Sequence, residues 1–175
     1  MNITGELSME DLHQLLEWAW ARHHNMYSWY IRPLFILPFC YFAWRRSLAG
    51  ILATLVATLT SIAWFPAPET PSPDALRYLE LERRWLSSGP LTLVMGLLVA
   101  ASLWLLGAAF WQRRWLYGVL VLNLATLAKV AFSVFLGGDA GWASLMPSLV
   151  TLAVCNAAFL ALYVLRRRIH AKSCP

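Results

Sequence analysis

Five apolar runs, each close to 20 residues long, dominate this sequence and constrain what it can fold into. A helix of about 20 apolar residues, rising 1.5 Å per residue, crosses the ~30 Å hydrocarbon core of a bilayer. Only 13% of the 175 residues are charged, whereas a soluble domain has about 25%. We therefore expect an all-α integral membrane protein, a single membrane domain over residues 1–175 built as a five-helix transmembrane bundle. The expected spans are 28–44, 47–64, 90–111, 115–136 and 144–165.

Two further helices are expected outside the hydrocarbon. Residues 8–27 have one apolar and one polar face at helical spacing, which predicts an N-terminal amphipathic helix, capped by Ser8, on the membrane surface or against the bundle. In the long loop 65–89, Ser72 is a suitable N-cap and Pro73 fits the first helical position. A short external loop helix is therefore expected there.

The charges give the five spans an orientation. Arginine pairs and a basic tail fall on one side of the five-helix arrangement, and all nine acidic residues fall on the other. The positive-inside rule places the basic side in the cytoplasm. We expect a multi-pass protein of the plasma (inner) membrane, with the N-terminus and loop 65–89 external and tail 166–175 cytoplasmic. The basic residues end apolar runs and do not line a soluble face, which argues against nucleic acid as a partner.

Small residues suggest how the helices pack. Small side chains at every fourth position permit close backbone approach, which drives helix association in lipid. We expect the two rows of this kind to face other helices, and we expect the leucine-rich run 91–111 to face lipid. The two rows are Ala49, Ala53, Ala57 and Ser61, and Ala153, Ala157 and Ala161.

The fourth apolar run contains a polar stripe, and such residues are costly in hydrocarbon and often functional. Asn123, Thr126 and Lys129 lie within about a third of the helix circumference at ~100° per residue. Asn156 of the fifth run should lie at a similar depth to Asn123 and hydrogen-bond with it. Together with Arg32 of the first run, these residues are the candidate ligand-binding set.

Lys129 admits three interpretations. Helical side chains lean toward the helix N-terminus, which here is cytoplasmic. This direction favours a Lys129 that faces the bundle interior, near Thr126 and the fifth helix, in a small polar pocket. Snorkelling to the outer interface and pairing with an external carboxylate are the alternatives.

Sites for metals and thiol chemistry have little support in the sequence. His13, Glu17 and His24 share a helix face and could bind a divalent metal, but their spacing is loose. The three cysteines, among them Cys174 in the tail, form no CxxC pair, so neither a disulfide nor a thiolate site is expected. None of the soluble catalytic motifs occurs, and no cofactor is assigned.

Three functions are compatible with these features. The first is a non-enzymatic membrane protein that binds or translocates a lipid-like or anionic small ligand. The second is an accessory or assembly subunit, in contact with a membrane-protein partner or a second copy of itself. The third is an intramembrane lipid-modifying enzyme using His23, His24 and the loop acids, and it ranks last because no acid–base group has suitable spacing.

Overall fold

A computed structural model of the chain describes the backbone of residues 9–173 and the side chains of that range except at 166, 167 and 169–173. The expected cap at Ser8 and the thiol of Cys174 lie outside the described residues. Over the described range the chain is all-helical, without a strand, as the sequence predicts. The elements are α1 (Met9–His23), α2 (Met26–Leu34), α3 (Ile36–Trp44), α4 (Leu48–Thr60), the 3-10 helix η1 (Ser61–Ala63), α5 (Pro73–Ser87), α6 (Pro90–Trp111), α7 (Trp115–Gly137), the 3-10 helix η2 (Gly138–Ser144) and α8 (Leu145–Ser173).

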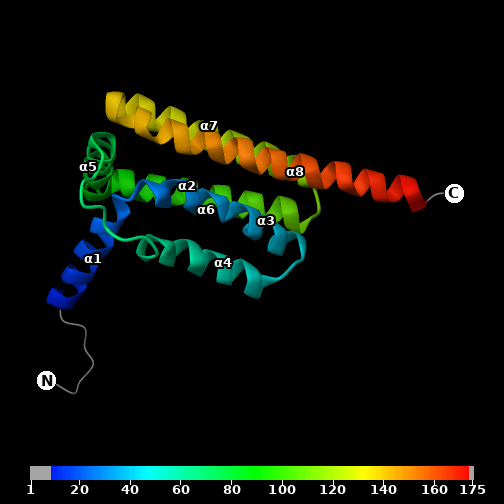
Figure 1. Cartoon of the computed structure of the whole chain (residues 1–175), viewed down its shortest axis with the longest axis horizontal. Coiled ribbons are helices and arrows are strands. Elements are labelled where there is room, and N and C mark those ends of the chain that lie inside the picture. The colour runs from blue at the N-terminus through cyan, green and yellow to red at the C-terminus, as the bar shows by residue number, and fades with distance from the viewer. Residues whose placement is uncertain (1–8, 174–175) are drawn as a thin grey trace, which may run out of the picture.

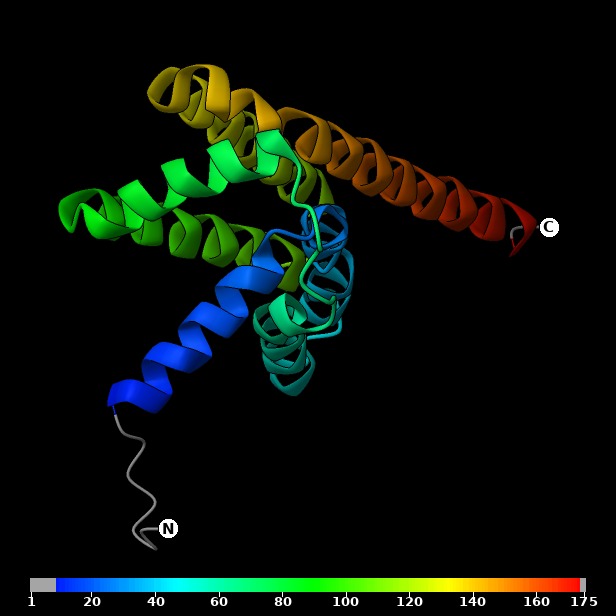
Figure 2. The ribbon, with the colours of Figure 1, turned by 60° about the vertical axis from the view of Figure 1, so that its left-hand side comes forward.

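The long helices lie roughly along one axis (Figure 1). α7 and α8 run side by side as an antiparallel pair joined by η2, and α6 packs against α7. α3 packs against α6 on one side and α4 on the other. α5 lies across the end of the bundle where η2 turns, and α1 extends away from that end (Figure 2).

Two helical segments are long and apolar enough to cross a membrane: Pro90–Trp111 and Trp115–Leu165. The second segment covers α7, η2 and most of α8, so the chain turns back on itself within it. The expectation of five separate crossings, and of their orientation, stays a prediction.

The apolar core has two parts. The larger cluster joins four helices through Phe39 of α3, Phe110 of α6, Leu122 of α7 and Phe159 of α8. The smaller cluster lies at the α5 end and packs Leu79 of α5 with side chains of α1, α2 and η2. The first holds the bundle together, and the second fixes α5 across its end.

The N-terminal elements differ from the predicted boundaries. The amphipathic helix ends at His23, before the expected residue 27, because Asn25 caps a new helix by accepting from Tyr27 N over 3.0 Å. The expected span 28–44 is interrupted at Phe35. Pro38 has no N–H to donate one turn back, which accounts for a break just before it.

The later boundaries agree closely with prediction. α6 covers the expected run 90–111, and α7 extends the expected run 115–136 by one residue. α5 begins at Pro73, and the Ser72 side chain accepts from Ala75 N over 3.2 Å, as a helix cap should. α8 continues as a helix to Ser173, past the end of the expected span 144–165 and into the expected tail 166–175.

Two similar turns reverse the chain at the arginine-bearing end. Arg46 and Arg113 both adopt left-handed backbone conformations, with φ of 56° and 61°. Each occupies the position after a helix that glycine usually takes in a Schellman motif. The turns also contact each other, since Arg46 Nε donates to Trp111 O over 3.2 Å and the Arg113 guanidinium lies 5.7 Å from the Trp44 ring centre. These contacts join the α3–α4 and α6–α7 turns.

The predicted small-residue row of α4 is wrong at Ala49 and Ala53 but right at its far end, where Ser61 is fully buried, and the predicted row of α8 is wrong. Ala49 and Ala53 are exposed, whereas Thr54 is buried and Gly50 contacts α3. In α8 the alanine row is exposed, and the buried row is instead Ser148, Thr151, Cys155 and Phe159. Small size permits close approach but does not decide which side of a helix is used.

The α3–α4 contact predicts an asymmetry between neighbouring positions. A Cβ at Gly50 would overlap the ring of Phe42, so Gly50→Ala should lower the free energy of unfolding by about 1–3 kcal/mol despite the better helix propensity of alanine. Ala53→Leu on the exposed side should change it little. Unfolding in detergent measures both, and equal losses at the two positions would contradict this packing.

Candidate functional site

The asparagines of α7 and α8 meet as predicted. Asn123 Nδ2 donates to Asn156 Oδ1, and Asn156 Nδ2 donates to Asn123 Oδ1, each over 3.0 Å. Each amide nitrogen also donates to the carbonyl four residues earlier, on Val119 and Leu152. The amide N–H donors are therefore fully used. We assign this pair the structural role of a clamp between α7 and α8.

Lys129 lines a cavity of about 440 Å³ between α3, α6 and α7. Thr126 lines it too, as expected. The prediction that the fifth helix also lines the Lys129 pocket is wrong, since no described residue of α8 contributes to the wall. The polar stripe is wide enough for its edges to face different neighbours: Asn123 faces α8 and Lys129 faces α6. The walls are otherwise mostly apolar, including Ile36, Met95, Leu98, Leu106 and Phe132.

Lys129 is the one charged group among the residues that line this cavity. It is exposed there. Within the part of the chain that the structure describes, no ion-pair partner contacts it, and the Glu82 carboxylate acts on its charge only through space. Thr126 Oγ1 donates to Leu122 O over 2.9 Å, so this hydroxyl is already satisfied as a donor. The cavity thus combines an apolar wall with one unpaired cation.

A chain of polar side chains links α2, α1 and α5 near this cavity. Arg32 Nη1 lies 2.9 Å from His23 Nδ1, and His23 Nε2 lies 3.2 Å from a carboxylate oxygen of Glu82. Because a guanidinium can only donate, His23 Nδ1 must accept, and the Nε2–H then donates to Glu82. The contacts therefore fix His23 as a neutral imidazole in one tautomer.

Aromatic side chains shield this cluster from water. The side chain of His23 is 13% exposed and that of Glu82 is 31% exposed. Trp29 Nε1 donates to His23 O over 2.9 Å, and the ring of Tyr78 packs 5.2 Å from that of Trp29. Burial raises the pKa of Tyr78, and the nearby Glu82 carboxylate raises it further, so the phenol stays protonated. Glu82 is thus held in a partly desolvated setting.

The Lys129 cavity and the His23 cluster are neighbours. Trp85 of α5 packs edge-on against Phe132, a cavity residue, with ring centres 5.5 Å apart. Glu82 lies one turn before Trp85 on the same helix. Its carboxylate acts electrostatically on both Arg32 and Lys129. The two cations therefore share one anionic neighbour.

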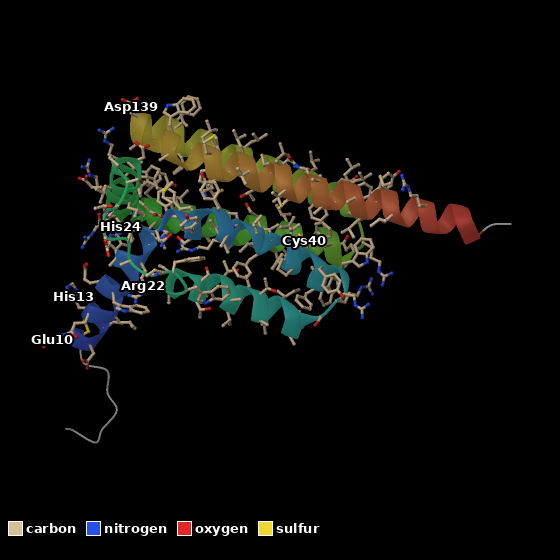
Figure 3. All side chains as sticks on the ribbon, viewed as in Figure 1. Glu10, His13, Arg22, His24, Cys40 and Asp139 are labelled. Carbon is tan, nitrogen blue, oxygen red and sulfur yellow. The ribbon has the colours of Figure 1, made fainter. Side chains whose placement is uncertain are left out.

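The candidate metal ligands are not brought together. Glu17 pairs with Arg83 over 3.2 Å, and His24 Nδ1 lies 2.9 Å from Trp20 O. His13 sits on the part of α1 that extends away from the bundle, whereas His24 lies where the helix reaches it (Figure 3). Within the described residues, no group of three or more His, Cys, Asp or Glu side chains is placed to hold a metal ion.

A second cavity, of about 320 Å³, lies toward the arginine-bearing turns. Its walls are aromatic and apolar, and they include Trp44, Phe110, Trp115 and the buried Cys40. None of its lining residues is charged. It offers shape and apolar surface but no group that would orient a polar ligand.

Glu82 was not predicted as a site residue, because the charge pattern grouped it with the other external acids. A signal was present, because Glu82 shares one face of α5 with Tyr78 and Trp85 at positions i, i+4 and i+7. An acidic residue between two aromatic residues on the same face is out of place on a solvated surface. His23 was considered only for catalysis, whereas its contacts make it a link between Arg32 and Glu82.

Comparisons with known proteins add no family. No protein-family model matches the chain, and neither a curated protein nor a solved structure matches it significantly. Function must therefore be argued from the site.

The asparagine clamp predicts coupled effects on stability. Asn123→Ala and Asn156→Ala should each lower the free energy of unfolding, and the double variant should lose little more than either single one. Interhelical side-chain bonds of this kind contribute about 0.6 kcal/mol on average and up to about 1.7. A double-mutant cycle by unfolding in detergent measures the coupling, and strictly additive losses would show that the two amides do not interact.

Proposed function

We propose that the protein is a non-enzymatic, multi-pass protein of the plasma (inner) membrane that binds an anionic lipid in the Lys129 cavity. The observation that carries the proposal is an unpaired cation in an apolar cavity of about 440 Å³. That volume lies within the range of about 300–1,000 Å³ found for ligand sites. An acyl chain suits the apolar wall, and a phosphate or carboxylate head group suits Lys129.

The exposed surface of the long helices supports a membrane setting. α6 exposes Leu93, Leu97, Val99 and Trp104, each with more than half of its surface accessible. Soluble monomers rarely expose contiguous apolar patches larger than a few hundred Å². α6, α7 and α8 each have more than 20 residues, enough to cross about 30 Å of hydrocarbon.

In the proposed topology α2–α3 forms the first crossing and α4 the second, and these two crossings are shorter than those of α6, α7 and α8. The 13 residues of α4 and the 3 of η1 span only about 24 Å. A short span is accommodated by local bilayer thinning and by flanking side chains that reach the interface. Arg45 and Arg46 at one end and Trp64 at the other are such side chains.

The energetic cost of Lys129 favours an anionic partner. Lys129 lies 14 residues along α7, about 21 Å from its start at Trp115. An unpaired lysine at the centre of a membrane helix costs about 2.5–3.5 kcal/mol, and less toward the interface. An anionic head group within reach of the ammonium would offset that cost, which an uncharged lipid cannot do.

The geometry of His23 favours binding over catalysis. A general base needs a free lone pair directed at the substrate. The Nδ1 lone pair of His23 accepts from Arg32, and its Nε2 proton is donated to Glu82. Both ring nitrogens are therefore occupied. This argues against the alternative of an intramembrane enzyme. The other alternative, an accessory subunit, would be supported by a protein that copurifies with this chain in a stoichiometric amount.

The proposed orientation predicts which loops react from outside. In a Cys174→Ser background, Glu69→Cys in the loop before α5 should react with an impermeant maleimide on intact cells. Gln112→Cys, in the turn between α6 and α7, should react only after the membrane is opened. Native Cys40 and Cys155 are buried and should stay silent. Labelling of Gln112→Cys on intact cells, with Glu69→Cys unreactive, would reverse the orientation.

The cavity predicts that binding depends on the charge of Lys129. Lys129→Met replaces an unpaired cation by an apolar side chain of similar length, so the free energy of unfolding should stay equal or rise. Affinity for phosphatidylglycerol should fall by about tenfold to a hundredfold, since a hydrogen bond between charged groups contributes about 1.5–3 kcal/mol. Titration of the purified protein in mixed detergent micelles measures the affinity.

Three controls sharpen this titration. Arg83→Met removes an exposed cation of α5 that pairs with Glu17, and it should leave binding unchanged. Phosphatidylcholine tests whether the head-group charge matters, and inorganic phosphate tests whether the acyl chain is needed. Unchanged phosphatidylglycerol affinity in Lys129→Met, or equal affinity for phosphatidylcholine, would overturn the proposed site.

A further inference from the structure

Arg32 and Lys129 come from different helices, yet the same carboxylate acts on both. Arg32 is on α2 and Lys129 on α7, and Glu82 of α5 acts electrostatically on both. Lys129 lines the apolar cavity, and the second cation and the anion belong to the His23 cluster, which reaches the cavity wall through the Trp85–Phe132 contact. The excess positive charge is what a single anionic head group would neutralise.

We propose that Arg32 is the second cation of the head-group site and that Glu82 is its resident counter-ion, with which an anionic lipid head group competes. This inference rests on the proposed function, because it assigns the regulation of that same site. In the absence of ligand, Glu82 partly neutralises the two cations. When an anionic head group binds between them, the carboxylate opposes it by like-charge repulsion.

The state of Arg32 supports its place in the site. Its guanidinium has five N–H donors, but only two contacts use them: one to His23 over 2.9 Å and a long one of 3.4 Å to Ser28 Oγ. Arg32 Nε is buried and has no hydrogen-bond partner within the described part of the chain. An unsatisfied buried donor costs about 1–3 kcal/mol. The planar guanidinium can give two parallel bonds to a phosphate or carboxylate.

The link between Arg32 and Glu82 is indirect, which makes the counter-ion replaceable. No direct ion pair joins the two in the described structure; the neutral imidazole of His23 lies between them. A hydrogen bond from a neutral imidazole holds a carboxylate less strongly than a bidentate arginine would. Glu82 also keeps 31% of its side chain exposed, so it can be rehydrated when a ligand enters.

The cavity reaches toward this cluster along two paths. Ile36, which lines the cavity, follows Arg32 by about one helical turn of chain. Phe132, on the same wall as Lys129, packs against Trp85, one turn from Glu82. A lipid whose acyl chain fills the cavity would therefore bring its head group to the side where α2 and α5 meet.

A purely structural role for Glu82, as a latch that holds α5 on α1, is the competing explanation. Glu82→Gln distinguishes the latch from the proposed competition, because the amide oxygen still accepts from His23 Nε2 while the negative charge is lost. A latch predicts no gain in binding from this change. Competition predicts tighter binding of an anion with the fold unchanged.

The test is a titration of the purified protein with phosphatidylglycerol in detergent micelles. Glu82→Gln should bind about tenfold more tightly than the wild type, within the range of about 5–150-fold typical of coupled sites. Arg32→Gln should bind about fivefold more weakly. Glu80→Gln is the matched control, since Glu80 is exposed on the same helix and pairs with Arg84, and it should bind like the wild type. Phosphatidylcholine binding should not respond to Glu82→Gln.

The outcomes distinguish a failure of the proposed competition from a failure of the proposed lipid binding. If the wild type binds phosphatidylglycerol and Glu82→Gln binds equally or more weakly, the competition is refuted while the proposed function stands. If Glu82→Gln does not fold, the Arg32→Gln titration decides, and unchanged affinity there removes Arg32 from the site. If neither the wild type nor Glu82→Gln binds the lipid, the proposed function fails and the competition with it.

Discussion

The hydrogen-bonding of polar side chains within the long apolar helices constrains the rest of the structure. In the proposed membrane setting no water reaches these helices, so each polar group needs a partner inside the protein. Hydroxyl groups meet this need locally: Thr54, Thr58 and Thr151 each donate to the carbonyl four residues earlier on their own helix. The Asn123–Asn156 pair meets it between helices. Two groups depart from the pattern: Lys129, which lines the cavity, and Arg32 Nε, which is buried without a partner in the described part of the chain.

The end of the bundle is organised around α5. Its apolar side chains pack onto α2 and η2, and two polar contacts, Glu17 with Arg83 and His23 with Glu82, tie it to α1. The exposed Glu17–Arg83 pair adds little stability, as surface ion pairs generally do. The more buried His23–Glu82 contact holds a negative charge that acts electrostatically on both Arg32 and Lys129. The architecture of this end therefore determines the electrostatics of the cavity beside it.

Sequence reasoning succeeded where local chemistry decides the outcome. Ser72 and Pro73 defined the start of α5, and the common depth of Asn123 and Asn156 was enough to predict their bond. It failed where tertiary contacts decide. Ala53 and Gly50 are both small, and only the position of Phe42 shows which of them faces α3. The role of Glu82 could not be derived from charge counting, because it depends on α5 folding over α1 and α2.

The central claim is that Lys129 holds an anionic lipid in the cavity between α3, α6 and α7. Native mass spectrometry of the protein, extracted from its own membrane in mild detergent, tests this most directly. The account predicts that the wild type retains one anionic lipid and that Lys129→Met, purified in the same way, does not. Equal retention by both proteins, or a wild type that carries no lipid, would contradict it.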